Sequence, residues 1–261
     1  MNILEEIIAY KHKEVAQNKE LNPISKLEKS KNFGLSVVSL KQSLIEPGKS
    51  GIIAEFKRRS PSRGIINLQA LVDQVTQGYI QAGASALSIL TDEKFFSGKN
   101  EDVLIAREYN TCPILRKEFV IDEYQIVEAK SLGADAILLI AACLSKEQIN
   151  NLAKFAKSLG LEVLLELHGE EEFDKISDEV ELVGINNRNL KTFKVDIEQS
   201  KKFAAKIPDN FIKIAESGID SPDIVKDLKN HGFKGFLMGE YFMNALYPDR
   251  ECTKFIRALN L

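Results

Sequence analysis

The chain alternates between short apolar runs and longer stretches in which apolar residues recur at helical spacing. The short runs are rich in Ile, Leu, Val and Ala, as expected for strands that are buried on both faces. Such alternation is typical of βαβ units around a parallel sheet. The pattern predicts eight strands, at residues 52–57, 86–91, 113–119, 136–140, 162–167, 182–187, 211–217 and 235–240.

Start and stop signals bound the helices between these runs. Residues that accept hydrogen bonds from free backbone N–H groups precede three of them, at Asp122, Ser145 and Ser221. Glycines, which readily adopt the left-handed backbone that closes a helix, follow the same three at Gly133, Gly160 and Gly232. We therefore expect helices at residues 124–131, 149–158 and 223–230.

Eight strand and helix units predict an α/β fold, a closed (β/α)8 TIM barrel, although an open doubly wound sheet has the same local pattern. The length of 261 residues fits one barrel, which typically takes about 250. We expect residues 1–261 to form a single domain, with the barrel in residues 51–261 and an N-terminal helical extension in residues 1–50. In the extension Ile3, Ile7, Ile8 and Val15 recur at helical spacing. It is either a packing lid over one end of the barrel or part of the cover of a site.

Composition and charge favour a small-molecule partner. The formal net charge is -3 and the charged residues, 28% of the chain, are interspersed, so no basic patch predicts nucleic-acid binding. No apolar run approaches the roughly 20 residues that span a bilayer, and acidic residues stand where a secretory signal would be basic. The sequence predicts a soluble, cytoplasmic protein that does not contact membranes.

Cysteine and histidine are too scattered to predict a disulfide framework or a metal centre. The three cysteines, Cys112, Cys143 and Cys252, lack CxxC spacing, and we expect them to be reduced. The three histidines lie far apart, without HExxH or His/Cys spacing. We expect no zinc or iron site.

Charged and amide side chains interrupt the apolar pattern where the strands should end. They are Glu55, Lys57, Lys117, Glu118, Glu166, Asn186, Asn187 and Arg188. Buried charges at a barrel mouth have a cost that folding alone does not justify, so the cluster predicts a site; ion pairs that only brace the mouth are the alternative. Residues two apart on a strand face the same way, so Glu55 and Lys57 can both point inward. Only one of Lys117 and Glu118 can face the barrel axis.

Glycine-containing turns end the last two strands, at Ser217-Gly218 and Gly239-Glu240. The loops after the seventh and eighth strands are the usual phosphate site of this fold, where backbone N–H groups hold the anion. Tight turns without a ligand are the alternative. Residues 60–64, SPSRG, form a further donor-rich loop that can close over a substrate.

Taken in order, several segments resemble indole-3-glycerol phosphate synthase, a (β/α)8 lyase of tryptophan biosynthesis. They are residues 53–57 (IAEFK), 60–64 (SPSRG), 90–98 (LTDEKFFSG), 115–119 (LRKEF), 184–190 (GINNRNL) and 215–219 (AESGI). The resemblance covers nearly the whole chain. Agreement of six segments in the order of the family is not expected by chance.

The resemblance implies a carboxy-lyase that converts 1-(2-carboxyphenylamino)-1-deoxyribulose 5-phosphate to indole-3-glycerol phosphate, with loss of carbon dioxide and water. It implies no cofactor and no metal. The aromatic carbon attacks the ketone carbon, so the ketone oxygen must be protonated as it becomes an alkoxide. The family match assigns this acid role to Lys117, which implies that Lys117 rather than Glu118 faces inward.

The same match implies roles for the other candidate catalytic residues. Lys57 is expected to hold the carboxylate of the substrate and to serve as an acid in the later dehydration. We favour Glu166 for removing the ring proton or stabilising positive charge on nitrogen, and Glu55 for positioning and proton handling around Lys57 and Lys117. Catalytic candidates by resemblance are Lys117, Glu166, Lys57, Glu55, Asn186 and Ser217.

Substrate-binding candidates by resemblance are Arg188, Ser60, Pro61, Phe96, Gly218, Gly239 and Glu240. With Asn186, Arg188 matches polar residues that bind the sugar hydroxyls and the carboxylate. Ser217, Gly218, Gly239 and Glu240 match the phosphate pocket, closed by Ser60. Phe96 and Pro61 match the apolar walls against the anthranilate ring.

Two positions, Glu240 and Tyr241, depart from the pattern of the family. Glu240 is expected to contact the phosphate through its backbone N–H, because its carboxylate would repel the anion. Tyr241 stands where the family usually has a small residue and is expected to face the helix layer. His168 follows Glu166 by two residues, but the matched motifs give it only a structural or solvent role.

Two other functions remain open at this point. Phosphoribosylanthranilate isomerase, or another phosphate-binding barrel, has the same last two loops but would need a Cys and Asp pair at strand ends. A non-catalytic barrel would be expected to have lost its catalytic charges. By resemblance, the partners are a phosphorylated small molecule and other enzymes of the tryptophan pathway.

Overall fold

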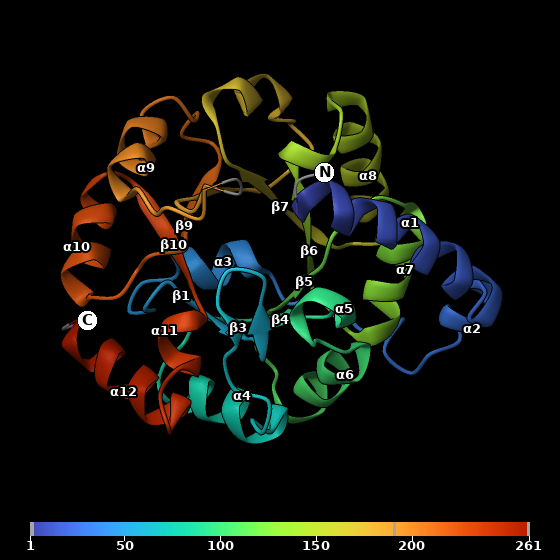
Figure 1. Cartoon of the computed structure of the whole chain (residues 1–261), viewed down its shortest axis with the longest axis horizontal. Helices are drawn as coiled ribbons and strands as arrows, with labels where there is room; N and C mark the ends of the chain where they lie inside the picture. Colours follow the sequence, from blue (N-terminus) through green and yellow to red (C-terminus); the bar gives the residue numbers. More distant parts are fainter. Residues whose placement is uncertain (1–2, 190–191, 260–261) are drawn as a thin grey trace.

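The computed structural model describes residues 3–189 and 192–259, and its centre is a closed barrel of eight parallel strands (Figure 1). The strands are β1 (Ile52–Phe56), β4 (Ala86–Leu90), β5 (Ile114–Lys117), β6 (Ala136–Ile140), β7 (Glu162–Leu167), β8 (Leu182–Asn186), β9 (Ile212–Glu216) and β10 (Phe233–Met238). They pair in the order β1-β10-β9-β8-β7-β6-β5-β4, and β4 pairs again with β1. This closure confirms the predicted barrel and excludes the open sheet. Leu190, the end of one motif, lies outside the described residues.

The observed strands differ from the predicted ones at their ends. The third strand of the barrel stops at Lys117 rather than at residue 119, because its ladder with β4 ends there. The last strand begins at Phe233 rather than at residue 235. Its pairing with β9 is irregular at this point, and the exposed Lys234 interrupts the apolar run that marks a strand.

Helices surround the barrel and connect its strands. They are α4 (Val72–Gln81), α5 (Glu93–Phe96), α6 (Asn100–Tyr109), α7 (Glu123–Leu132), α8 (Lys146–Ser158), α9 (Ile197–Ala204), α10 (Pro222–Asn230), α11 (Glu240–Met243) and α12 (Pro248–Ala258), with the 3₁₀ helices η1 (Ala141–Cys143) and η2 (Glu170–Lys175). The predicted caps are confirmed, since Asp122, Ser145 and Ser221 each accept a backbone hydrogen bond at the helix start. The glycines that follow these helices have φ between +78° and +90°.

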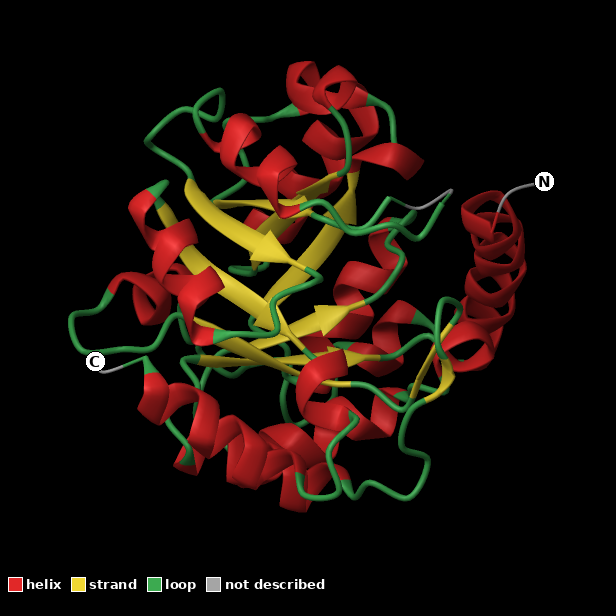
Figure 2. Ribbon diagram, turned by 60° about the vertical axis from the view of Figure 1, so that its left-hand side comes forward, coloured by secondary structure: helices red, strands yellow, loops and turns green. Residues whose placement is uncertain are grey.

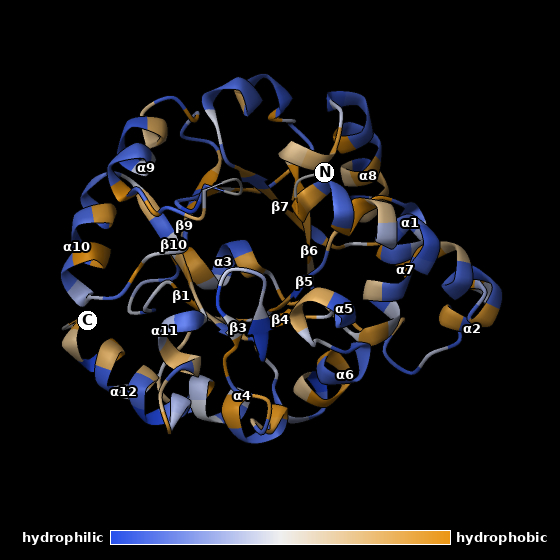
Figure 3. Ribbon diagram, viewed as in Figure 1, coloured by the Kyte–Doolittle hydropathy of each residue, from blue (hydrophilic) through white to orange (hydrophobic). Residues whose placement is uncertain are grey.

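Two apolar layers hold the barrel together. One fills its interior and includes Ile53, Leu164 and Leu237. The other packs between the strands and the outer helices and includes Tyr79 and Phe236. In Figure 3 the strands are mostly orange, whereas the helices also carry blue, hydrophilic residues. Each large apolar side chain buried in this way stabilises the fold by about 1.5–3 kcal/mol.

The inward-facing positions change from apolar to polar toward the C-terminal ends of the strands. Residues that face inward lie two apart along a strand, so a strand can place an apolar side chain in the core and a polar one at the mouth of the barrel. The step occurs from Ile53 to Glu55, from Leu115 to Lys117, from Leu164 to Glu166 and from Ile214 to Glu216. On these four strands the core therefore ends in charged side chains.

The N-terminal extension covers both ends of the barrel. It contains α1 (Ile3–Leu21), α2 (Ile24–Leu27) and α3 (Leu40–Ile45). Helix α3 lies at the N-terminal ends of the strands, where Ser43 Oγ donates a hydrogen bond to the Ser85 carbonyl and Leu40 and Leu44 enter the interior layer. Figure 2 shows the strand arrows pointing toward the side where α1 and the hairpin of β2 (Arg59–Ser60) and β3 (Gly64–Ile65) lie.

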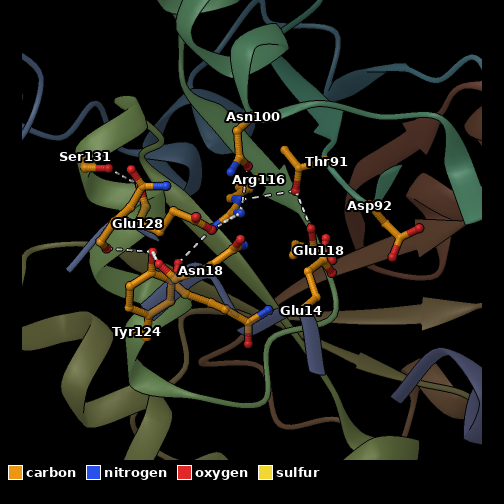
Figure 4. A network of polar contacts seen from close by, with 12 residues as sticks. Glu14, Asn18, Thr91, Asp92, Asn100, Arg116, Glu118, Tyr124, Glu128 and Ser131 are labelled. Atoms are coloured by element: carbon orange, nitrogen blue, oxygen red, sulfur yellow. Dashed lines mark hydrogen bonds and ion pairs between the residues drawn. The ribbon is translucent and has the colours of Figure 1, made fainter. Parts of the chain in front are cut away.

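A buried network of charges fastens α1 to this end of the barrel. Lys11 is 2% exposed, and its Nζ lies 2.9 Å from Glu118 Oε1. The Thr91 hydroxyl donates to Glu118 Oε2 and accepts from Arg116 Nε, as Figure 4 shows. The residues on either side of Lys117 thus both turn away from the axis, which leaves Lys117 directed inward.

None of the helices in the described part of the chain combines the length and the apolar character needed to cross a membrane.

Candidate functional site

A cavity of about 790 Å³ opens at the C-terminal ends of the barrel strands. Its volume falls within the range of small-molecule sites, about 300–1,000 Å³. Every catalytic and substrate-binding candidate from the sequence lines it: Glu55, Lys57, Ser60, Pro61, Phe96, Lys117, Glu166, Asn186, Arg188, Ser217, Gly218, Gly239 and Glu240. The fold therefore brings all of these side chains and turns to one place. Asn187, also in the polar cluster, is not part of this lining, and its Nδ2 donates instead to the Ser217 carbonyl at 2.8 Å.

Lys117 ends β5, and its ammonium group lies between two carboxylates. Its Nζ donates hydrogen bonds to Glu166 Oε2 at 2.7 Å and to Glu216 Oε2 at 2.6 Å. Burial by itself would lower the pKa of Lys117, but these two carboxylates and that of Glu55 raise it above its ordinary value. Lys117 therefore keeps its positive charge at neutral pH. The alternative inward residue, Glu118, points instead to Lys11.

Glu166, on β7, is held by three neighbours. Besides Lys117, Asn186 Nδ2 donates a hydrogen bond to its Oε1 at 3.2 Å. His168 Nε2 lies 3.1 Å from the same oxygen, without the alignment of a hydrogen bond. Burial would raise the pKa of Glu166, but Lys117 and then His168 hold it well below the ordinary value. Glu166 is therefore ionised at neutral pH. His168, to which the sequence motifs give only a structural or solvent role, lies directly beside this carboxylate.

Glu216 ends β9 and is a site residue that sequence reasoning missed. The sequence interpretation places this strand end in the phosphate turn, whereas the side chain points inward to Lys117. The available signal was spacing, because Glu216 follows the inward Ile214 as Glu166 follows Leu164. Burial raises the pKa of Glu216 to about 8; Lys117 opposes this rise and Glu166 supports it. Of the two carboxyl groups beside Lys117, Glu216 rather than Glu166 takes up a proton near neutral pH.

Glu55 and Lys57 face the cavity from the end of β1, as their two-residue spacing predicts. Lys57 Nζ lies 2.7 Å from Glu55 Oε1, and Ser88 Oγ donates to Glu55 Oε2 at 3.3 Å. Glu55 is almost fully buried, whereas Lys57 is more exposed. The carboxylate therefore fixes the position of Lys57 and leaves its ammonium group accessible from the cavity.

The turns after β9 and β10 form one end of the cavity. Ser217 and Gly218 both have left-handed φ, of +67° and +71°, which is strained for serine. At Gly239 a Cβ would lie 2.9 Å from the Glu55 Cβ, so the backbone comes close to the catalytic candidates only because the residue is glycine. Both turns follow the last two strands of the barrel, where this fold usually binds phosphate.

Apolar side chains form the opposite wall of the cavity. The rings of Phe96 and Phe119 lie 5.9 Å apart, and both residues line the cavity. Ile3, Leu4 and Ile7 of α1 line it as well. The extension is therefore both a packing element and part of the cover of the site, and sequence reasoning did not assign these three residues to it.

Tyr241 faces the helix layer, as predicted. Its hydroxyl donates a hydrogen bond to Glu251 Oε1 of α12 at 3.1 Å, and its ring lies 5.5 Å from that of Phe255. Although Tyr241 contributes to the lining of the cavity, its polar end is engaged away from the phosphate turns.

Replacing Gly239 by alanine should disturb the site directly. The new Cβ would force Glu55 to move, and with it Lys57, so we expect KM to rise about tenfold or more, since shifts near 1 Å have effects of that size. Steady-state kinetics test this, with Gly34→Ala as the control, because a Cβ at Gly34 meets nothing within 4 Å. An unchanged KM in Gly239→Ala would remove this turn from the site.

The chain is similar in sequence to known proteins of one family. The family model described as indole-3-glycerol phosphate synthase matches residues 4–259. An indole-3-glycerol phosphate synthase from Bacteroides thetaiotaomicron is 48% identical over 258 residues, which cover 99% of each chain. One from Caldanaerobacter subterraneus subsp. tengcongensis is 43% identical over 245 residues, covering 92% of this chain and 93% of the relative.

Solved structures show the same fold at low sequence identity. Tryptophan synthase subunit alpha from Legionella pneumophila aligns with a TM-score of 0.58 at 12% identity, over 80% of this chain and 90% of the other. Thiamine phosphate pyrophosphorylase from Pyrococcus furiosus aligns with a TM-score of 0.59 at 15% identity, over 85% and 99%. These likenesses concern the barrel alone.

Proposed function

Since the chain belongs to the indole-3-glycerol phosphate synthase family, we propose that its barrel-mouth cavity carries out that family's ring closure with the residues described above. The reaction converts 1-(2-carboxyphenylamino)-1-deoxyribulose 5-phosphate to indole-3-glycerol phosphate, carbon dioxide and water. The observation that carries the assignment of residues is the ammonium group of Lys117, held inside the cavity by Glu166 and Glu216.

Lys117 is the acid of the first step. When the aromatic carbon attacks the ketone carbon, the ketone oxygen gains negative charge and then a proton. A lysine that stays protonated in a largely buried site stabilises this charge more strongly than it would in water. The same closure leaves positive charge on the ring and its nitrogen, and the ionised Glu166 is placed to stabilise it.

Lys57 serves the carboxylate that is lost as carbon dioxide. Its ammonium group is held from one side by Glu55 and is open to the cavity on the other, which suits a transient ion pair with the substrate. After decarboxylation restores the aromatic ring, the remaining hydroxyl takes up a proton and leaves as water, and the neighbouring CH2 carbon loses a proton as the indole double bond forms. We assign the donated proton to Lys57, which Glu55 positions, and the uptake of the proton from carbon to the Glu55 carboxylate.

The two ends of the substrate fit the two ends of the cavity. The phosphate binds at the turns of Ser217-Gly218 and Gly239-Glu240, with Ser60 at the edge of the same cavity. The anthranilate ring packs on the side of Phe96 and Pro61. Asn186 contacts the polar middle of the substrate, and Arg188, which pairs with Glu240, lies between this middle and the phosphate turns.

The alternative functions fit less well. A phosphoribosylanthranilate isomerase would need a reactive cysteine at the mouth, and Cys143 does follow β6 in η1. Cys143 is absent from the described cavity lining, and burial, together with Glu166, raises the pKa of its thiol to about 12. A non-catalytic barrel would not retain Lys57, Lys117 and Glu166 in contact with one cavity.

We also propose that the protein works in the cytoplasm, because a phosphorylated sugar derivative does not cross membranes unaided. Other enzymes of tryptophan biosynthesis are its proposed partners, as suppliers of the substrate and consumers of the product.

A continuous fluorescence assay tests the proposed function. The chain is incubated with 1-(2-carboxyphenylamino)-1-deoxyribulose 5-phosphate, and appearance of indole fluorescence is followed. We expect turnover with this substrate and none with phosphoribosylanthranilate. A folded protein that leaves the first substrate unchanged would refute the assignment.

The raised pKa of Glu216 predicts a pH-dependent stability. Because the pKa in the folded protein, about 8, exceeds the ordinary value of 4.5, the stabilisation from protonated Glu216 is complete below pH 4.5 and is lost as the pH rises through 8. Glutamine does not titrate, so the Glu216→Gln variant does not lose this stabilisation as the pH rises. Its free energy of unfolding, relative to that of wild type, should therefore be higher at pH 8.5 than at pH 5.5. Urea unfolding at the two pH values, with Glu198→Gln as an exposed control, measures the difference. A relative stability that stays constant would contradict the shift.

A further inference from the structure

Three charged side chains meet at the phosphate end of the cavity. Arg63 Nε donates a hydrogen bond to Glu240 Oε1 at 2.7 Å, and Arg188 Nη2 donates one to Glu240 Oε2 at 3.1 Å. Arg63 lies in the β2–β3 hairpin, Arg188 follows β8, and Glu240 opens α11. One carboxylate therefore joins two loops across the edge of the site.

This arrangement resolves the difficulty of a carboxylate beside a phosphate. An unpaired Glu240 would repel the anion, whereas two guanidinium groups and one carboxylate leave a net charge of one positive unit at this edge. Guanidinium groups bind carboxylates and phosphates through the same planar set of N–H donors. In the resting protein, the oxygens of Glu240 therefore occupy donors that a phosphate can use.

We propose that the Glu240 carboxylate competes with the substrate phosphate for Arg63 and Arg188. In the empty site Glu240 holds the two guanidinium groups, and the phosphate takes over their N–H donors when it binds. The inference deepens the proposed function, on which it rests for the place of the phosphate.

The solvent exposure of these side chains indicates that the ion pairs of Glu240 can be exchanged rather than serve as a fixed support. Arg63 is 61% exposed and Glu240 is 22% exposed, so water screens their ion pair and it is easily broken. Arg188 is 19% exposed, and its backbone N–H is held by Asn186 Oδ1 at 3.0 Å. Arg63 is thus the mobile partner, and its transfer to the phosphate draws the hairpin that carries Ser60 and Pro61 over the substrate.

Calorimetric titration of the resting enzyme with inorganic phosphate tests the competition without any turnover. The proteins are wild type, Glu240→Gln, Arg63→Met and the double variant. We expect Glu240→Gln to bind phosphate about fivefold more tightly, the effect of removing one nearby negative charge at the surface. In the Arg63→Met background the same change should have a clearly smaller effect, because one of the contested donors is gone.

Two results would overturn the inference. Weaker phosphate binding by Glu240→Gln would mean that the carboxylate holds the arginines in place for the phosphate. An equal effect of Glu240→Gln with and without Arg63 would mean that Arg63 is not exchanged. Glu170→Gln is the matched control, because Glu170 forms an exposed ion pair with Lys206 and should leave phosphate binding unchanged. Because the titration uses no substrate, its outcome is separate from that of the ring-closure assay.

Discussion

Replacing Lys117 by methionine is expected to lower kcat for ring closure by about three orders of magnitude, within the range for loss of a positioned acid or a charge-stabilising donor. Methionine keeps the approximate length of the side chain but removes the cation that Glu166 and Glu216 hold. The developing alkoxide then has neither a proton nor a positive charge beside it. The fluorescence assay measures kcat, and circular dichroism checks that the barrel is retained.

The control for this variant is Lys154→Met, which changes an exposed lysine of α8. It should retain wild-type kcat. If Lys117→Met stays within tenfold of wild type, Lys117 is not the acid, even if the protein makes indole-3-glycerol phosphate.

Replacing Lys11 by methionine is expected to lower the free energy of unfolding by about 3–5 kcal/mol, the usual cost of breaking a buried ion pair by removing one partner. Lys11 Nζ lies 2.9 Å from Glu118 and 3.0 Å from Asp92, and it also contacts Glu14. Without the cation, the buried carboxylates of Asp92 and Glu118 face one another. Urea denaturation measures the loss.

The same helix supplies the matched control. Lys19 pairs with Asp122 at 2.7 Å, but its side chain is 47% exposed. Lys19→Met should therefore cost no more than about 1 kcal/mol. Equal losses in Lys11→Met and Lys19→Met would show that the buried network does not fasten α1 to the barrel.

The architecture of the barrel could be predicted because two kinds of signal in the sequence agree. Apolar runs mark the strands, and cap residues such as Ser145 and Gly160 mark the ends of the helices between them. Strand ends were harder to place, because pairing rather than composition decides them. Lys234 breaks the apolar run of the last strand although it lies within β10.

The site could be predicted as far as it depends on positions along single strands. Lys117, Glu166 and the pair of Glu55 and Lys57 follow from where strands end and from the family motifs. Sequence spacing could not choose between Lys117 and Glu118, because that choice depends on Lys11, far away in the chain. The resemblance made the choice, and the buried network gives its physical reason.

Contacts across the barrel could not be predicted from the sequence. Glu216 meets Lys117 only because β9 and β5 face each other across the closed ring. Arg63 meets Glu240 only because the first loop folds over the last strand's end. No local pattern encodes such distances, since they depend on closure of the whole barrel.

The most direct test of the account follows the carboxylate that ring closure must expel. With substrate labelled by carbon-13 in its carboxyl group, we expect labelled carbon dioxide and indole-3-glycerol phosphate to form in equal amounts with wild-type protein. Neither product should form at a comparable rate with Lys117→Met. Carbon dioxide without the indole product, or no consumption of substrate by folded wild-type protein, would contradict the account.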